Sequence, residues 1–223
     1  MQPFSQTEPI IVLDFETTGL YPAKGDRVIE IGAVLLREQK IVDRFQSLVN
    51  PGFFVSREIE TITGITNAML SEAPPALEVM GQFVKFLDSH PLVAHNASFD
   101  RSFLEAELDH LGKKRPLNFG CTLQIARRLY PDVINYKLET LIRYKNIPVN
   151  SQFHRALADA EMAALLWFKI IEDLKSQFGF ENITFDLMKK IGKLNKDLAF
   201  DLLLKEAEDS RTDQIGTTGN LFG

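Results

Sequence analysis

The sequence predicts an α/β fold in which helices cover a β-sheet. Three β-rich runs follow one another near the N-terminus, at residues 10–15, 27–37 and 40–49. Later segments carry apolar residues at helical spacing and are interrupted by a brief strand at 91–95 and a short element near 118–121. Strands followed by helices and further short strands favour a sheet with helices packed on it.

The first strand is expected to be buried and central. Its sequence, IIVLDF at 10–15, is apolar up to an acidic residue and leads into a Thr-Thr-Gly loop. The runs at 27–37 and 40–49 are separated by only two residues, which indicates an antiparallel hairpin. Glu30 is an acidic residue inside the second strand, and we expect it to lie on a solvated edge of the sheet.

The remaining segments are predicted to be mainly helical. Residues 56–70 should form two short helices around a Thr-Gly turn. The helix after Pro74-Pro75 should bury an apolar face made of Leu77, Met80, Val84 and Leu87. Further helices are expected at 98–111, 122–129, 137–145 and 156–174, the last of which is the longest.

The chain length fits one domain with an appended segment. Its 223 residues lie near the usual range of ~100–200 residues per domain. We assign residues 1–175 to this domain and 176–205 to a helical extension, because apolar residues at helical spacing predict one helix over 183–204. Residues 206–223 carry few apolar groups and are predicted to be a flexible tail.

Composition and charge exclude several classes of protein. The single cysteine, Cys121, cannot form an internal disulfide bond, so a disulfide-stapled secreted fold is excluded. We see no signal peptide and no apolar run of ~18 residues, and we expect a cytoplasmic protein with no membrane partner. The net charge of −5 argues against a protein that coats nucleic acid through bulk positive charge.

Asp14 and Glu16 form the first candidate site. They stand two residues apart at the end of a predicted strand, so their side chains point to the same face. Two adjacent carboxylates repel each other unless a cation lies between them. Because Mg²⁺ and Mn²⁺ prefer oxygen ligands, the pair is a candidate metal site. In the alternative interpretation, one carboxylate caps the next turn and the other is solvated.

Two further acidic residues lie near the starts of predicted helices, and each follows a histidine. Asp100 comes after a strand that ends in His95-Asn96, and functional sites collect at strand ends in α/β sheets. Asp159 lies on the longest helix, with His154 in the loop before it. Alternatively, Asp100 only stabilises a helix N-terminus and His154 is an ordinary surface residue.

The three elements together resemble the motifs of the DEDDh (DnaQ-like) 3′–5′ exonuclease family. D-F-E-T-T-G at 14–19 matches the first motif, V-A-H-N-A-S-F-D at 93–100 the second, and H-R-A-L-A-D-A at 154–160 the third. The resemblance covers residues 10–175. It implies an RNase H-like fold, with a mixed five-stranded sheet flanked by helices and, in this chain, a helical C-terminal extension.

The resemblance also implies a role for each motif residue. Asp14, Glu16, Asp100 and Asp159 would hold two divalent cations, Mg²⁺ or Mn²⁺, and His154 would be the general base. The substrate would be the 3′ end of single-stranded or frayed DNA, and the product a nucleoside 5′-monophosphate. Contacts to the terminal nucleotide would come from Thr17, Thr18, Gly19, Leu20, Ile62, Thr63, Ile65, His95 and Asn96.

Two alternatives remain open at this point. The same chemistry could act on RNA, as in the RNase T and oligoribonuclease relatives, because selectivity depends on how the site treats a 2′-hydroxyl. The fold could also serve as an interaction module for a DNA polymerase or a sliding clamp. Proofreading relatives hold their polymerase through C-terminal segments, so the region from Leu187 onward is the candidate for such a contact.

Overall fold

A five-stranded mixed sheet forms the centre of the molecule. The computed structural model describes residues 8–149, 155–180 and 182–218. The strands lie in the order β3-β2-β1-β4-β5, and β1 is central, as predicted. Neighbours β3, β2 and β1 are antiparallel, whereas β1, β4 and β5 are parallel. The bounds are β1 Ile10–Thr17, β2 Val28–Arg37, β3 Lys40–Leu48, β4 Leu92–Ala94 and β5 Phe119–Cys121.

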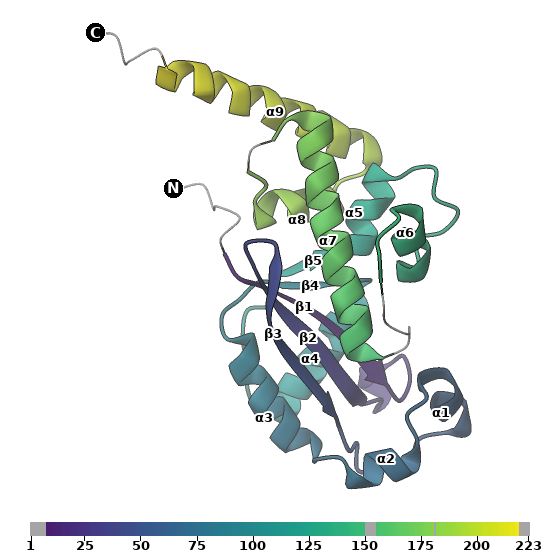
Figure 1. Ribbon diagram of the computed structural model, residues 1–223. Helices are drawn as coiled ribbons and strands as arrows, with labels where there is room; N and C mark the ends of the chain where they lie inside the picture. Colours follow the sequence, from purple (N-terminus) through teal and green to yellow (C-terminus); the bar gives the residue numbers. More distant parts are fainter. Residues whose placement is uncertain (1–7, 150–154, 181, 219–223) are drawn as a thin grey trace.

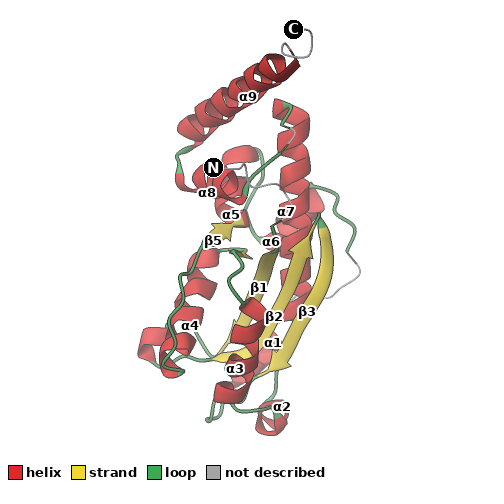
Figure 2. Ribbon diagram, turned by 90° about the vertical axis from the view of Figure 1, so that its left-hand side faces the viewer, coloured by secondary structure: helices red, strands yellow, loops and turns green. Residues whose placement is uncertain are grey.

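Helices cover both faces of the sheet (Figures 1 and 2). The helices that precede β5 in the sequence are η1 Pro22–Lys24, α1 Arg57–Thr63, α2 Asn67–Glu72, α3 Ala76–Leu87 and α4 Ala97–His110. The helices that follow β5 are α5 Thr122–Leu129, α6 Leu138–Tyr144, α7 Ala156–Phe178, α8 Phe185–Lys193 and α9 Lys196–Thr218. The α1–α2 pair has the predicted Thr-Gly turn, in which Gly64 takes a φ of 70° and ends α1.

The two faces of β1 belong to different apolar clusters. Ile11, Leu13 and Phe15 pack with side chains of α3 and α4. Val12 points the other way and packs with residues of α5, α6 and α7. Because side chains alternate along a strand, Asp14 and Glu16 lie on the same face as Val12. The sheet therefore aims both acids at the layer that contains α7.

The buried side of α3 differs from the prediction. Leu77 is exposed, and the helix buries Val79, Met80, Phe83 and Leu87 instead. Two of these four residues, Met80 and Leu87, belong to the predicted buried face. Phe83 takes the inward position because its ring contacts the rings of Phe15 and Phe45 from the sheet.

The C-terminal segment differs from the prediction in two ways. A single helix over 183–204 is wrong, because α8 ends at Lys193 and α9 begins at Lys196. The Asn195 side chain between them accepts the Leu198 amide N–H at 2.9 Å, as an N-cap does. The described part of the predicted tail, residues 206–218, is helical and continues α9. Residues 219–223 lie outside the described residues.

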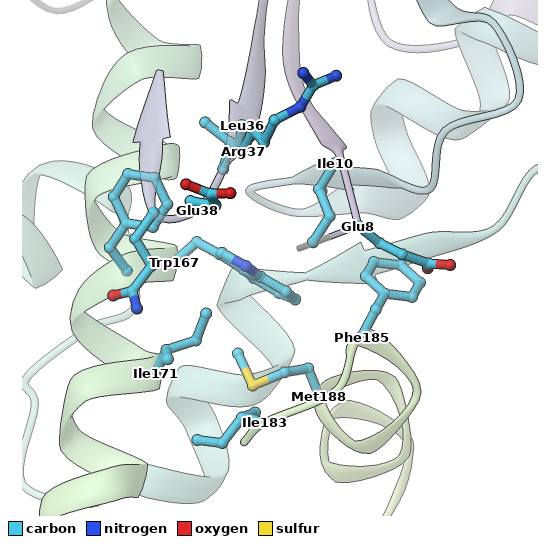
Figure 3. Close-up of a pocket in the computed structure, with 12 residues that line it drawn as sticks. Glu8, Ile10, Leu36, Arg37, Glu38, Trp167, Ile171, Ile183, Phe185 and Met188 are labelled. Carbon is cyan, nitrogen blue, oxygen red and sulfur yellow. The ribbon is translucent and has the colours of Figure 1, made fainter. Parts of the chain in front are cut away.

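The extension shares its core with the sheet domain. Phe185, Met188 and Ile191 of α8 and Ala199 and Leu203 of α9 belong to the cluster that contains Trp167. A small apolar pocket opens here, between the start of β1 and α8 (Figure 3). Ile10, the first residue of β1, lines this pocket. The pocket therefore lies at the opposite end of the strand from Glu16.

Glu30 is not on a solvated edge. β2 is flanked by β1 and β3, and Glu30 is fully buried. The expectation is wrong because Arg155 and Ala156, far away in sequence, supply hydrogen bonds to this carboxylate. Among the described helices, none combines the length and the apolar character needed to cross a membrane.

Candidate active site

The site is built at the junction of β1, β2 and the first turn of α7. Asp159 lies in that first turn, on the face of the sheet that also carries Asp14 and Glu16. Each of these three residues offers a carboxylate oxygen, and the three oxygens lie within 4.8 Å of one another. The structure therefore brings together three acids that are up to 145 positions apart in the sequence.

Gly32 explains how α7 can come so close to the sheet. It pairs with Asp14 across the β1–β2 ladder. A Cβ atom on Gly32 would lie 2.1 Å from the carbonyl carbon of Ala156 and 2.1 Å from the amide nitrogen of Leu157. The backbone of α7 thus rests directly on β2, and this contact sets the height of Asp159 above Asp14.

Asp100 approaches the same strand from α4, on the other side. Its Oδ1 atom accepts the Phe15 amide N–H at 3.2 Å. This N–H is free to bond the side chain because β4 pairs with β1 only at Ile11 and Val12. Asp100 is almost fully buried and is not one of the three acids whose oxygens converge within 4.8 Å. Its charge is nevertheless close enough to raise the pKa of Asp14.

The acids of the site have raised pKa values. Burial, followed by repulsion from Asp100, Asp159, Glu16 and Glu30, raises the pKa of Asp14 well above its ordinary value. Burial, Asp159 and Glu30 raise the pKa of Glu16 to about 7, although Arg155 acts in the opposite direction. Burial raises the pKa of Asp100 to about 8. Such concentration of like charge is typical of a site that binds cations.

The donor set fits a hard divalent cation. The three converging groups offer only carboxylate oxygens, which are the ligands that Mg²⁺ and Mn²⁺ prefer. A bound cation would also relieve the repulsion that raises the pKa of Asp14. The predicted metal ligands Asp14, Glu16 and Asp159 are thus consistent with the geometry, and Asp100 lies beside them.

The predicted general base, His154, lies outside the described residues. The first described residue after it is Arg155, the N-cap residue of α7. The role of His154 therefore stays a prediction.

The loop after β1 is held by side chains and presents Leu20 outward. The Thr17 hydroxyl donates to the Gly19 carbonyl at 2.6 Å. The Thr18 hydroxyl accepts the Arg27 amide N–H at 3.0 Å. A Cβ atom on Gly19 would lie 2.4 Å from the Asp26 carboxylate, so a larger residue there would displace the side chain that accepts the Tyr21 amide N–H. Leu20 is 66% exposed and is available for the predicted nucleotide contact.

The Ile-Thr-Gly-Ile segment is only partly available to a ligand. Ile62 is exposed, as a base-contacting residue requires. Ile65 is fully buried among Ile29, Val55 and Leu70. The Thr63 hydroxyl donates to the Ile59 carbonyl at 2.8 Å inside α1. The structure therefore places Ile65 and Thr63 in the packing beneath the surface, which argues against their predicted contact with a base.

His95 and Asn96 have structural roles at the end of β4. The two ring nitrogens of His95 bond the Thr122 hydroxyl and the Tyr136 carbonyl, each at 2.9 Å. Burial lowers the pKa of His95 to about 4, so the ring is neutral near pH 7. With both nitrogens engaged inside the protein, the ring has no polar atom left for a nucleotide. Asn96 is exposed, has a φ of 69° and is the N-cap residue that precedes α4.

Two residues that the sequence did not indicate, Glu30 and Arg155, also lie at this site. Glu30 lies opposite Glu16 in the β1–β2 ladder, and its carboxylate accepts the Arg155 guanidinium and the Ala156 amide N–H. An acidic residue within an otherwise apolar strand, VIEIGAV, was the available signal.

Comparisons with known proteins agree with this geometry. A family model described as exonuclease, RNase_T, matches residues 11–167. The chain belongs to this exonuclease family. The match confirms the resemblance to DnaQ-like exonucleases that the motifs predict, and it covers all the described acids of the site.

The curated relatives are much longer than this chain. It is 39% identical over 174 residues to the PolC-type DNA polymerase III of Caldanaerobacter subterraneus subsp. tengcongensis. It is 40% identical over 175 residues to the PolC-type DNA polymerase III of Bacillus cereus. Each alignment covers 78% of this exonuclease-family chain but only 12% of the relative.

Solved structures support the fold assignment. Exonuclease X in complex with 5′-overhanging duplex DNA is 30% identical, with a TM-score of 0.65. That alignment covers 82% of this chain and 99% of the other. The nuclease domain of 3′hExo, a DEDDh family member bound to rAMP, has a TM-score of 0.64 at 20% identity. It covers 75% of this chain and 93% of the other, and it shows the fold alone.

Proposed function

We propose that this protein is a metal-dependent 3′–5′ exonuclease that removes nucleotides from single-stranded or frayed DNA ends. The observation that carries the proposal is the convergence of the Asp14, Glu16 and Asp159 carboxylates on an exonuclease-family fold. The DNA-bound exonuclease X and the PolC-type relatives support DNA as the substrate. The products would be nucleoside 5′-monophosphates.

Two divalent cations, Mg²⁺ or Mn²⁺, are part of the proposal. Asp14, Glu16 and Asp159 would hold them, and Asp100 would contribute its oxygen that does not accept the Phe15 amide. Bound cations would supply positive charge to the phosphate and lower the pKa of the attacking water. His154 would take the proton of that water on a ring nitrogen, because a neutral imidazole can accept a proton near pH 7.

The proposal is tested with a 5′-labelled single-stranded DNA oligonucleotide in Mg²⁺, in Mn²⁺ and in chelator. We expect a ladder that shortens from the 3′ end in either metal and no cleavage in chelator. Asp14→Asn should abolish the ladder, while Asp43→Asn, an exposed acid on β3, should leave it unchanged. Internal cleavage, or equal digestion by Asp14→Asn, would refute the proposal.

A substrate panel then separates DNA from RNA. Matched single-stranded DNA, mismatched-end DNA, fully paired duplex DNA and RNA of the same sequence are digested under identical conditions. We expect the first two to be degraded faster than the other two. Faster digestion of RNA would instead support the exoribonuclease alternative.

We also propose that the C-terminal helix contacts a DNA polymerase or sliding clamp, in keeping with a proofreading role. Leu198, Phe200 and Leu204 of α9 are each between 45% and 54% exposed, which leaves apolar surface for a partner. The PolC-type relatives support a replicative context. Purified replicative polymerase and clamp should bind the wild-type chain more tightly than a variant in which Leu198, Phe200 and Leu204 are replaced by Ser. Equal binding would exclude a contribution from this surface.

A further inference from the structure

We propose that Glu30 is a positioning residue of the active site. Its carboxylate fixes the first turn of α7 on the sheet and thereby holds Asp159 against Asp14 and Glu16. The inference rests on the metal-dependent function proposed above and extends it to a residue outside the three motifs.

The carboxylate of Glu30 is fully engaged. Oε1 accepts Arg155 Nη2 at 2.7 Å and Gln46 Nε2 at 3.1 Å. Oε2 accepts the Ala156 amide N–H at 3.1 Å. Arg155 Nε lies 3.2 Å and 3.1 Å from the two oxygens. Since N–H donors occupy both oxygens, Glu30 is a positioning residue and not a further metal ligand.

These contacts meet a need of α7. Ala156 is the first residue of the helix, where backbone N–H groups lack partners within the helix. Arg155, the N-cap residue, makes no capping hydrogen bond with its own side chain. The capping acceptor comes instead from Glu30 on β2, which ties the helix start to the sheet. Asp159 lies within the same turn, and its amide N–H donates to the Arg155 carbonyl at 3.0 Å.

Gly32 and Glu30 act on the same helix end from neighbouring positions of β2. Gly32 permits the close approach at Ala156 and Leu157, and Glu30 provides the hydrogen bonds that hold it. Because Glu16 pairs with Glu30 and Asp14 pairs with Gly32, these contacts set α7 opposite the two β1 ligands. A displaced helix start would move Asp159 relative to both.

A second buried glutamate provides a matched control. Glu107 of α4 accepts Arg27 Nε and Nη2 at 2.8 Å each and the Val28 amide N–H at 3.3 Å. It therefore resembles Glu30 in burial, in its arginine partner and in its backbone contact, but its hydrogen bonds run to Arg27 and Val28 and not to the start of α7. Loss of either carboxylate should weaken the fold, and only loss of Glu30 should disturb the metal site.

The test compares Glu30→Gln with Glu107→Gln in the full chain. Mn²⁺ affinity is measured by calorimetry on folded protein, and thermal stability is measured in chelator. We expect both variants to lower the Tm. Glu30→Gln should weaken Mn²⁺ binding by about 10–100-fold, the usual effect of losing a group that orients a metal ligand. Glu107→Gln should bind Mn²⁺ within about twofold of the wild type, because its contacts do not hold a metal ligand.

Kinetics on labelled oligonucleotide give an independent readout. Glu30→Gln should lower kcat at saturating metal and leave KM for DNA unchanged, because Glu30 acts through Asp159. Arg155→Lys keeps the charge but loses the planar fork, and Arg155 is half-exposed, so this variant should fold. It should weaken Mn²⁺ binding several-fold, and it provides the test if Glu30→Gln does not fold.

Two results would overturn the inference. One is wild-type Mn²⁺ affinity in folded Glu30→Gln or, failing that variant, in Arg155→Lys. The other is an equal loss of Mn²⁺ affinity in Glu107→Gln, which would indicate general loosening. If the protein binds Mn²⁺ through Asp14 but does not cleave DNA, the proposed nuclease function is refuted. The Mn²⁺ affinities of Glu30→Gln and Glu107→Gln would still decide whether Glu30 positions the metal ligands.

Discussion

The two ends of α7 each carry an acidic residue, half-buried Asp159 at the first end and buried Asp173 at the second, and the fold surrounds them differently. Asp159 in the first turn lies beside Asp14 and Glu16. Asp173, near the other end, receives the Tyr130 hydroxyl at 2.7 Å and the Lys145 ammonium at 2.6 Å. At the second end the chain supplies the cation itself, whereas at the first end it gathers further carboxylates.

The pKa values record this difference. Burial alone would raise the pKa of Asp173, but hydrogen bonds from Lys145 and Tyr130 outweigh it and hold the pKa below its ordinary value. At the other end, burial and neighbouring acids raise the pKa of Asp14. The comparison teaches that burial of an acid does not identify a functional site. The charge of its neighbours separates a structural acid from a metal-binding one.

Removing Asp173 should have the largest effect on stability. Asp173→Ala leaves Lys145 and the Tyr130 hydroxyl buried without this partner and should lower the free energy of unfolding by about 3–5 kcal/mol. Urea denaturation measures the change. Glu172→Ala, which removes an exposed neighbour, should cost less than about 1 kcal/mol. Equal effects of the two substitutions would contradict the structural role of Asp173.

Gly32→Ala should disturb the other end of α7. The added Cβ would overlap the backbone of Ala156, so we expect a loss of about 1–3 kcal/mol in stability. Nuclease activity of the folded fraction should fall as well, because Asp159 moves with the helix. Gly81→Ala in α3 is the control, since nothing lies within 4 Å of the added Cβ. Gly81→Ala should be neutral or stabilising. A loss of stability as large as that of Gly32→Ala would contradict the overlap with the α7 backbone as the cause.

Asp14→Asn should stabilise the metal-free protein while abolishing activity. Burial and the neighbouring acids disfavour the charged form of Asp14 in the folded state, so a neutral amide at this position should raise the free energy of unfolding by on the order of 1 kcal/mol in chelator at pH 8. Added Mn²⁺ should raise the Tm of the wild type more than that of the variant. A destabilised variant in chelator would show that the Asp14 charge has a favourable partner.

The two ends should also respond to pH with opposite sign. Glu16 and Asp100 have pKa values raised from 4.5 to about 7 and from 3.8 to about 8, so the folded state binds more protons in this window. The free energy of unfolding contributed by them therefore falls as pH rises from about 4 to 8, by at most about 1.4 kcal/mol per pH unit for each group. For Asp173 the contribution is present above its ordinary pKa and is lost as pH falls below it.

Thermal unfolding in chelator from pH 3 to pH 9 measures both contributions. Glu16→Gln should make the decline between pH 4 and pH 8 shallower, because it removes one titrating group and one charge acting on Asp100. Asp173→Ala should leave that decline in place and weaken the loss of stability at low pH. A wild-type Tm that rises steadily between pH 4 and pH 8 would contradict the raised pKa values.

The strands and the acidic motifs could be predicted because their signals are local. Apolar runs bounded by turns predicted the first four strands and a short element at the place of β5, and period 2 placed Asp14 and Glu16 on one face. The break before α9 also had a local signal, since Asn195 is a strong N-cap residue type. The predicted helix ran through it because the leucine spacing continues across the break.

Other features depend on residues that are distant in sequence. Glu30 can be buried because Arg155, 125 positions away, pairs with it. The sequence around Glu30 does not predict which residue will be its partner. His95 resembles a substrate-contacting residue in sequence, yet Thr122 and Tyr136 use both of its nitrogens. The buried Ile65 likewise depends on Ile29 and Leu70 packing around it.

The length of α7 has a consequence for insertions and deletions. The helix contains neither Pro nor Gly between Ala156 and Phe178, so nothing within it can absorb a change of register. Adding or deleting one residue between Asp159 and Asp173 would rotate one end by about 100° and shift it by about 1.5 Å relative to the other. Such a change would turn one of the two acids away from its partners. The stretch between them is therefore a fixed spacer, in which substitutions are tolerated more readily than changes of length.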